Sequence, residues 1–189
     1  MVCLLNVDCV HSAAGNSHAH RGRCRALIAL AVGGVLPACI DMLGGLSVSE
    51  AVLNECTSDI PAPGAAILQD LHAAHRFKNI PSANLMPLDP SFAQGLGGCE
   101  IAVLSYAAQN GLLVLIDERR ARRAADCLGV SVIGSGTVLA QLKRKGCIDS
   151  VKPILSAWRQ HSYFVAEPVL AGMLRLADES SYAAEFGQT

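Results

Sequence analysis

The chain has 189 residues, a formal net charge of −1 and a hydrophobic fraction of 51%. This length favours one domain with a sizeable buried core, and the near-neutral charge excludes a broadly basic nucleic-acid binder while leaving room for a local basic face. No apolar run reaches the roughly 18–20 residues that would span a bilayer, and no basic stretch precedes the apolar start as it would in a signal peptide.

The 8 cysteines include no C-x-x-C pair, so the sequence indicates neither a zinc ribbon nor a thioredoxin-like motif. Most of them lie among aliphatic residues, where cysteine behaves as a small hydrophobe. We therefore expect a reduced, cytoplasmic protein without a membrane partner. An aromatic content of 4% also argues against a base-stacking platform.

The amino-terminal residues differ from the rest of the chain. Residues 3–8, "CLLNVD", predict a strand that ends at Asp8, whereas residues 9–24 have loop composition and no apolar period. That loop is long, because connections in compact α/β units usually have about 2–6 residues. We expect an atypical segment over 1–24, one domain over 25–178 and a frayed tail over 179–189.

The first half of the domain predicts short helices around one strand. Apolar runs over 26–31 and 36–43 predict two helices that are broken at Gly33–Gly34. Residues 45–48 predict a strand, after which Ser49 caps a helix over 50–56. Another helix is expected over 64–77, followed by a connection rich in proline and glycine over 79–98.

From residue 100 onward, helices and strands alternate regularly. "LLVLI" is a continuous apolar run typical of a fully buried strand, and "VSVI" predicts a second strand. The expected helices cover 100–111, 118–129, 134–146, 151–165 and 168–179. This alternation of strand and helix predicts an α/β fold with a parallel sheet.

Four acids are expected at one edge of this sheet. Asp117 follows "LLVLI" directly, and Asp8 has the same position if residues 3–8 form a strand. Glu100 follows a glycine pair at a helix start, and Glu55 lies near the end of the helix over 50–56. Closely packed carboxylates repel one another, and Mg²⁺ or Mn²⁺ relieves that repulsion because both ions take oxygen ligands.

Each acid also has a purely structural explanation. Glu100 suits the dipole of a helix amino terminus, Asp117 suits the N-cap of the helix that follows it, and Glu55 suits a solvated helix face. The metal-site hypothesis therefore depends on the acids as a set.

The stretch "GGCEIAVLSYAAQNGLLVLIDERRARRAADCLGVSVIGSGTVLAQLKRKGCID" resembles the PIN-like nuclease superfamily, in particular a prokaryotic branch close to the toxins of VapBC-type toxin–antitoxin pairs. That branch has an acid after a glycine pair, an aliphatic strand ending in two acids, an Ala-Arg helix and a basic helix ending in G-x-I. The similarity covers roughly residues 26–178. Glu100, with Ala102 one position short of the usual spacing, and the pair Asp117–Glu118 match these motifs, and Glu55 matches the glutamate of a V-x-x-E motif.

The resemblance implies a three-layer fold with a central parallel sheet flanked by helices, and a metal-dependent ribonuclease activity. It implies that Glu55, Glu100 and Asp117 are catalytic and bind Mg²⁺ or Mn²⁺, with Glu118 as an auxiliary ligand. It also implies RNA as the substrate, an antitoxin protein as a partner and a homodimer. Ions bound in this way activate water and stabilise charge on the phosphodiester.

The chain departs from the family pattern at its amino end. The family has an aspartate a few residues before the helix over 26–31, and here Arg23 takes that place. Either Asp8 supplies the missing ligand from a first strand over 3–8, or the chain is a catalytically inactive relative that serves as a binding or regulatory module.

Basic and hydroxyl side chains near Asp117 are candidates for RNA contacts. Arg119 and Arg122 follow Asp117, and Arg122 either contacts a phosphate or pairs with Glu118 one turn away. Ser135 and Thr137 lie in a glycine-bordered turn, where they either hold a phosphate at a helix amino terminus or cap that helix.

Overall fold

The computed structural model describes residues 2–4, 25–57, 63–80, 96, 98–161, 163 and 165–179. Within these residues, five parallel strands form one sheet in the order β3-β2-β1-β4-β5. The strands are β1 (Val2–Leu4), β2 (Leu46–Ser49), β3 (Phe77–Ile80), β4 (Leu113–Leu115) and β5 (Val132–Ile133). Because all five run in one direction, their carboxyl ends meet at one edge of the sheet.

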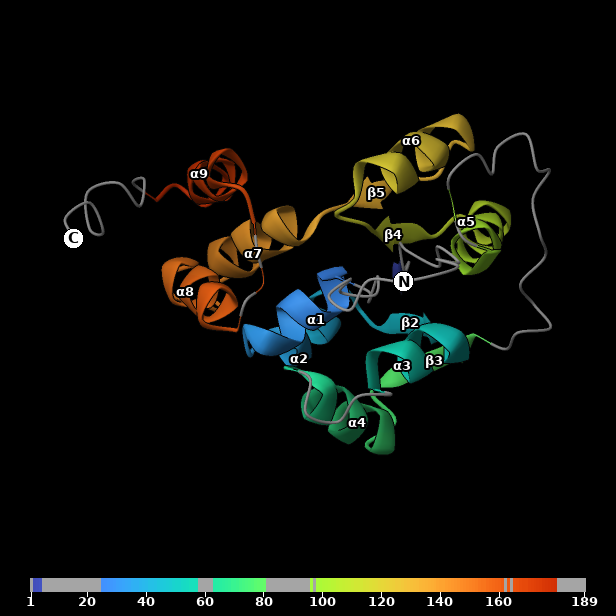
Figure 1. Ribbon diagram of the computed structural model, residues 1–189, viewed down its shortest axis with the longest axis horizontal. Coiled ribbons are helices and arrows are strands. Elements are labelled where there is room, and N and C mark those ends of the chain that lie inside the picture. The colour runs from blue at the N-terminus through green and yellow to red at the C-terminus, as the bar shows by residue number, and fades with distance from the viewer. Residues whose placement is uncertain are drawn as a thin grey trace, which may run out of the picture.

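The helices pack on both faces of this sheet (Figure 1). They are α1 (Arg25–Val32), α2 (Leu36–Met42), α3 (Glu50–Thr57), α4 (Ala65–Ala73), α5 (Gly98–Asn110), α6 (Arg119–Cys127), α7 (Ser135–Arg144), α8 (Lys152–Gln160) and α9 (Glu167–Leu176). None of the helices in the described ranges combines the length and apolar character needed to cross a membrane.

Strand β4 shows how the sheet separates two hydrophobic cores. Leu115 belongs to the larger core with α1, α2 and α7, whereas Val114 and Ile116 belong to the smaller core with α5 and α6. Successive side chains of a strand point to opposite faces, so a run of consecutive aliphatics must be covered on both sides. The predicted three-layer α/β fold with a parallel sheet is thereby confirmed.

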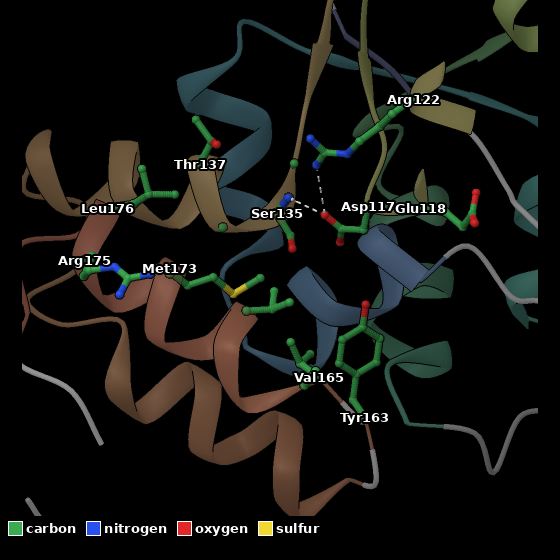
Figure 2. Close-up of a pocket in the computed structure, with 15 residues that line it drawn as sticks. Asp117, Glu118, Arg122, Ser135, Thr137, Tyr163, Val165, Met173, Arg175 and Leu176 are labelled. Carbon is green, nitrogen blue, oxygen red and sulfur yellow. Dashed lines mark hydrogen bonds and ion pairs between the residues drawn. The ribbon is translucent and has the colours of Figure 1, made fainter. Parts of the chain in front are cut away.

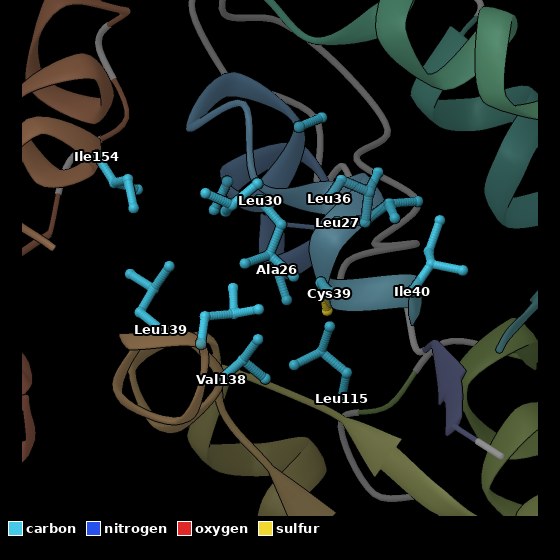
Figure 3. Close-up of a cluster of buried hydrophobic side chains, with 14 of the residues drawn as sticks. Ala26, Leu27, Leu30, Leu36, Cys39, Ile40, Leu115, Val138, Leu139 and Ile154 are labelled. Atoms are coloured by element: carbon cyan, nitrogen blue, oxygen red, sulfur yellow. The ribbon is translucent and has the colours of Figure 1, made fainter. Parts of the chain in front are cut away.

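The larger core joins helices that are far apart in the sequence (Figure 3). Leu27 of α1, Leu36 of α2 and Leu139 of α7 are all fully buried in it. The Cys39 thiol lies in the same core, and burial raises its pKa to about 12. This cysteine therefore stays protonated and contributes packing, as expected for a cysteine among aliphatics.

The carboxyl-terminal end of α9 is fastened to α7 and to the start of α8 by one carboxylate. Glu179 accepts hydrogen bonds from the Val151 N–H and the Ser150 hydroxyl, both at 2.8 Å, and its Oε1 lies 2.9 Å from Lys143 Nζ. Lys143 also donates to the Ala177 carbonyl at 2.8 Å. Only 8% of the Glu179 side chain is exposed, although it is the first residue of the expected frayed tail.

Burial and hydrogen bonding act in opposite directions on the pKa of Glu179. Desolvation raises it, but hydrogen bonds from Val151, Lys143 and Ser150 and the charge of Lys143 together outweigh this effect, so the pKa is lowered. The charged form of Glu179 therefore stabilises the packing of α9.

Most predicted elements are confirmed, with two corrections. The Ser49 hydroxyl accepts from the Val52 N–H at 3.3 Å, as expected for the cap of α3. The helix expected over 64–77 is wrong at its end, because Phe77–Ile80 forms the edge strand β3. The helix expected over 151–165 ends at Gln160. The predicted strand end at Asp8 lies outside the described residues.

Candidate functional site

Asp117 lies where two neighbouring strands end. It follows β4 after the buried Ile116, while β5 ends at Ile133 and α7 begins at Ser135. Its Oδ1 atom accepts a hydrogen bond from the backbone N–H of Ser135 at 2.8 Å. The Asp117 side chain is 22% exposed, and its Oδ2 atom has no hydrogen-bond partner among the residues that the structure places. The protein thus orients one oxygen, and within the described part of the chain the other has no competing protein donor.

Arg122 approaches the same carboxylate from α6. Its Nη2 atom lies 3.9 Å from Asp117 Oδ1, and its side chain is 40% exposed. Gly134 makes this approach possible, since a Cβ atom there would lie 2.2 Å from Arg122 Nη2 and 3.2 Å from Asp117 Oδ1. The anticipated alternative, a pair between Arg122 and Glu118, is not found among the described side chains. The guanidinium instead lies over a glycine beside Asp117.

Glu118 provides the cap of α6. Its Oε2 atom accepts from the backbone N–H groups of Arg120 at 2.7 Å and Ala121 at 3.0 Å. The alternative that Asp117 caps this helix is therefore wrong, and Asp117 is left free to face the neighbouring helix α7. Arg119 is exposed at the first position of α6.

Ser135 and Thr137 occupy the first turn of α7, but neither caps it. The N-cap residue is Gly134, which has no side chain to donate or accept. Ser135 is 1% exposed, and its hydroxyl oxygen has no hydrogen-bond partner in the described part of the chain. A buried hydroxyl without a partner costs free energy, so this atom is suited to meet a ligand or a water molecule beside Asp117.

A cavity of about 790 Å³ opens in front of these groups (Figure 2). One side is polar and consists of Asp117, Glu118, Arg122 and the first turn of α7. The opposite side is formed by the segment before α9 and by α9 itself. The residues that contribute to this opposite side are Tyr163, Val165, Ala166, Val169, Gly172, Met173, Arg175 and Leu176.

Two other predicted metal ligands, Glu55 and Glu100, are placed by their backbone only. Glu55 lies in α3, which follows β2, and Glu100 is the third residue of α5; their side chains lie outside the described residues, as do Asp8 and Arg23 entirely. Since β1 alone separates β2 from β4, the carboxyl ends of those strands are roughly 10 Å apart. No group of three metal-ligating side chains occurs among the described residues, so the acid cluster stays a prediction.

The sequence analysis did not identify α9 as the helix that lines the opposite side of the cavity. A signal was nevertheless present, because α9 carries two apolar stripes at helical spacing. Leu170, Leu174 and Ala177 are buried in the larger core, whereas Val169 and Leu176, which line the cavity, are 47% and 53% exposed. One apolar stripe is enough to pack a helix against the core. A second apolar stripe on the same helix therefore indicates a surface that contacts something other than the core.

The parallel sheet between two helical layers, with an acid-bearing cavity at its carboxyl edge, defines a three-layer α/β domain whose site lies where such folds bind ligands. A family model described as a PIN domain matches residues 24–179. The chain therefore belongs to the PIN domain family, and the resemblance to that superfamily is confirmed. Neither a curated protein nor a solved structure matches the chain.

Membership of the PIN domain family indicates a nuclease-type function with RNA as the substrate class, and PIN domains generally use divalent metals. The donors near Asp117 agree with such an ion. A carboxylate oxygen and a buried serine hydroxyl that both lack a partner among the described residues are hard oxygen ligands of the kind that Mg²⁺ and Mn²⁺ take.

Proposed function

We propose that the chain is a metal-dependent ribonuclease that hydrolyses RNA phosphodiesters. The observation that carries this proposal is the state of Asp117, whose Oδ1 is oriented by the Ser135 N–H while its Oδ2 has no partner among the described residues. A carboxylate held in this way is pre-organised for a cation, because binding requires no rearrangement of the side chain.

In this proposal the metal ligands are Asp117, Glu55 and Glu100, with Asp8 and Glu118 as further candidates. The Oε2 atom of Glu118 already caps α6, so only its other oxygen is available. A bound Mg²⁺ or Mn²⁺ supplies a water of lowered pKa and stabilises charge on the phosphodiester. The protein's own contribution is to hold the carboxylates at one edge of the sheet and to orient Asp117 through the Ser135 N–H.

The residues proposed to contact RNA are Arg122, Arg119, Ser135 and Thr137. Arg122 has the strongest support, since its guanidinium lies at the polar side of the cavity beside Asp117. There it neutralises a phosphate that approaches the carboxylates. Ser135 and Thr137 lie in the first turn of α7, whose dipole favours a negative group. Arg119 is exposed on α6 and extends the positive charge outward.

An RNA cleavage assay tests this function. We expect cleavage that requires Mg²⁺ or Mn²⁺ and is lost in Glu100→Ala and Asp117→Asn. Asp126→Asn is a matched control, because Asp126 is an exposed acid on the same helix as Arg122 and does not line the cavity. Equal cleavage by the wild type, both site variants and the control would exclude the proposed assignment.

The biological setting is a further part of the proposal. The motifs over 97–150 support a toxin-like component of a toxin–antitoxin pair in the cytoplasm, restrained by an antitoxin protein, and the apolar composition suits a homodimer. Light scattering of the purified chain, alone and with the product of a neighbouring gene, tests both associations. A monomer that binds no such product would contradict them.

A second function is favoured by one specific residue. Arg23 stands where the family has an aspartate, and a cation in that place repels metal. A catalytically inactive PIN-like binding or regulatory module would then result. The two functions differ in one measurable property, namely Mn²⁺ binding that depends on Asp117.

A further inference from the structure

We propose that Tyr163 is a catalytic residue whose hydroxyl donates a hydrogen bond to the scissile phosphate group. The juxtaposition that carries this inference is the phenol of Tyr163 directed at the Asp117 carboxylate, with both side chains lining the same cavity (Figure 2). The inference rests on the proposed ribonuclease function and adds to its site a residue that lies outside the carboxylate motifs of the sequence.

Tyr163 is held in place by the end of α8. Its backbone N–H donates a hydrogen bond to the Trp158 carbonyl at 2.8 Å, which turns the chain back at the end of that helix. The two aromatic rings pack against each other, with their centroids 5.3 Å apart and their planes tilted by 60°. A tilted pair is a favourable arrangement of aromatic rings, so the orientation of the Tyr163 ring follows from that of Trp158.

Trp158 is in turn fixed to α1. It is fully buried, and its Nε1 atom donates a hydrogen bond to the Ala29 carbonyl at 2.7 Å. Gly33 permits this approach, because a Cβ atom there would lie 3.3 Å from Trp158 Nε1 and 2.5 Å from Ile154 Cγ2. A continuous series of contacts therefore connects the core helix α1 to the ring of Tyr163. A catalytic side chain needs such support, since a misplacement of about 1 Å can remove much of the rate.

The Tyr163 hydroxyl supplies the cavity with a hydrogen-bond donor that the acids cannot supply. Figure 2 shows its oxygen pointing toward Asp117 from one side, while Arg122 approaches the same carboxylate from the other. Ionised carboxylates such as Asp117 and Glu118 only accept hydrogen bonds, whereas a phenol also donates. A phosphate group that binds in the cavity therefore meets a donor at Tyr163 in addition to the guanidinium of Arg122.

The chemical role of this donor is to stabilise charge. Phosphoryl oxygens carry negative charge in the transition state of the reaction, and a donor that already points at them lowers the barrier without any rearrangement of the protein. The hydrogen bond from Tyr163 therefore strengthens between the bound substrate and the transition state. No proton is transferred in this role, and the phenol keeps its hydrogen throughout.

Tyr163→Phe tests the hydroxyl alone, because it keeps the ring beside Trp158. We expect kcat for RNA cleavage in Mg²⁺ to fall at least about tenfold, while KM changes by about twofold or less, since the interaction is made mainly in the transition state. Tyr106→Phe is the matched control, because Tyr106 lies on α5 and does not line the cavity. It should leave both constants unchanged. Equal kcat in the wild type and Tyr163→Phe would overturn the proposal.

Tyr163→Leu separates the hydroxyl from the ring. It removes both groups, and its kcat should lie within a few-fold of that of Tyr163→Phe. Full activity in Tyr163→Phe together with a loss in Tyr163→Leu would show that the ring contributes only packing, and this result would overturn the catalytic role. A fall in kcat that is matched by a fall in the melting temperature of Tyr163→Phe would assign the hydroxyl a structural role instead.

Binding of inorganic phosphate provides a readout that does not depend on cleavage. Phosphate is titrated by calorimetry into the wild type and Tyr163→Phe, once in Mg²⁺ and once in EDTA. We expect Tyr163→Phe to bind phosphate about tenfold more weakly wherever the wild type binds it, as is typical when a hydrogen bond to a charged group is lost. Equal affinity of the two proteins, or no binding by the wild type in either solution, would overturn the phosphate contact.

The ribonuclease function and the role of Tyr163 can fail separately. A wild type that binds phosphate through Tyr163 but never cleaves RNA would exclude the ribonuclease function and retain the phosphate contact. A wild type that cleaves RNA as fast as Tyr163→Phe would retain the ribonuclease function and exclude the catalytic role of Tyr163.

Discussion

Asp117 and Ser135 join the end of β4 to the first turn of α7 through a hydrogen bond of 2.8 Å between Oδ1 and the backbone N–H, although 18 residues separate them in the sequence. The bond uses the backbone of Ser135 and leaves its buried hydroxyl without a partner among the described residues. An alanine at residue 135 would keep the bond to Asp117 and remove only the hydroxyl.

We therefore predict opposite effects of Ser135→Ala on stability and on metal binding. The free energy of unfolding should stay constant or rise by about 1 kcal/mol, because the variant no longer buries an unsatisfied hydroxyl. The affinity for Mn²⁺ should fall about tenfold, which is typical when a group that supports a metal site is lost. Chemical denaturation and calorimetry measure the two quantities. A clear loss of stability would show that the hydroxyl has a structural partner instead.

We predict that Arg122 contributes to RNA binding and not to the stability of the fold. Its ion pair with Asp117 is long, at 3.9 Å, and partly exposed, so Arg122→Ala should change the free energy of unfolding by less than about 0.5 kcal/mol. RNA binding should weaken, and the slope of log K against log salt should decrease by about one phosphate contact. Arg122→Lys keeps the charge and should keep the slope. An unchanged slope in Arg122→Ala would contradict a phosphate contact.

Gly134→Ala should mimic the loss of Arg122. The new Cβ atom would lie 2.2 Å from Arg122 Nη2 and 3.2 Å from Asp117 Oδ1. The flexible guanidinium must therefore move away, whereas the carboxylate needs to shift only slightly. We expect RNA binding to fall to the level of Arg122→Ala, and the double variant to bind no more weakly than either single one, since both remove the same contact. Additive losses would show that Gly134 acts on RNA independently of Arg122.

The contribution of Glu179 to the packing of α9, which lines the cavity, can be tested by its dependence on pH. Because the pKa of this carboxyl is lowered in the folded state, its contribution is fully present above its unfolded-state pKa of about 4.3 and disappears as the pH falls through the lower folded-state value. At neutral pH, Glu179→Gln should reduce the free energy of unfolding by about 1–2 kcal/mol, as expected for hydrogen bonds to a charged group.

The difference in stability between wild type and Glu179→Gln should shrink when both are unfolded at progressively lower pH below about 4.3. Glu167→Gln is the control, because Glu167 pairs with Arg159 in an exposed ion pair and should matter by less than about 0.5 kcal/mol. A difference that persists at the lowest pH would mean that the charge of Glu179 is not what stabilises α9.

The sequence predicted the inner strand β4 because its segment carries an unmistakable pattern. In "LLVLI" every residue is apolar, and the structure covers both faces of that segment with helices. The edge strand β3 lacks such a pattern, since Lys78 and Asn79 are exposed and only Ile80 is buried. A short strand at an edge is stabilised by its neighbour's backbone, which local sequence does not reveal.

The site was predictable in part for a similar reason. The position of Asp117 follows from the end of a buried strand, but the choice between Asp117 and Glu118 as the cap of α6 depends on which carboxylate faces the N–H groups of Arg120 and Ala121. The wall of the cavity depends on the way α9 packs against α7, which no local pattern specifies.

The most direct measurement is a calorimetric titration of Mn²⁺ into the wild type, Asp117→Asn and Asp126→Asn. We predict saturable binding in the wild type, equal binding in Asp126→Asn, and a loss of at least tenfold in Asp117→Asn, since this change removes one charged ligand and keeps the shape of the side chain. Binding of equal strength in all three proteins, or no binding in the wild type, would contradict a metal site at the end of β4.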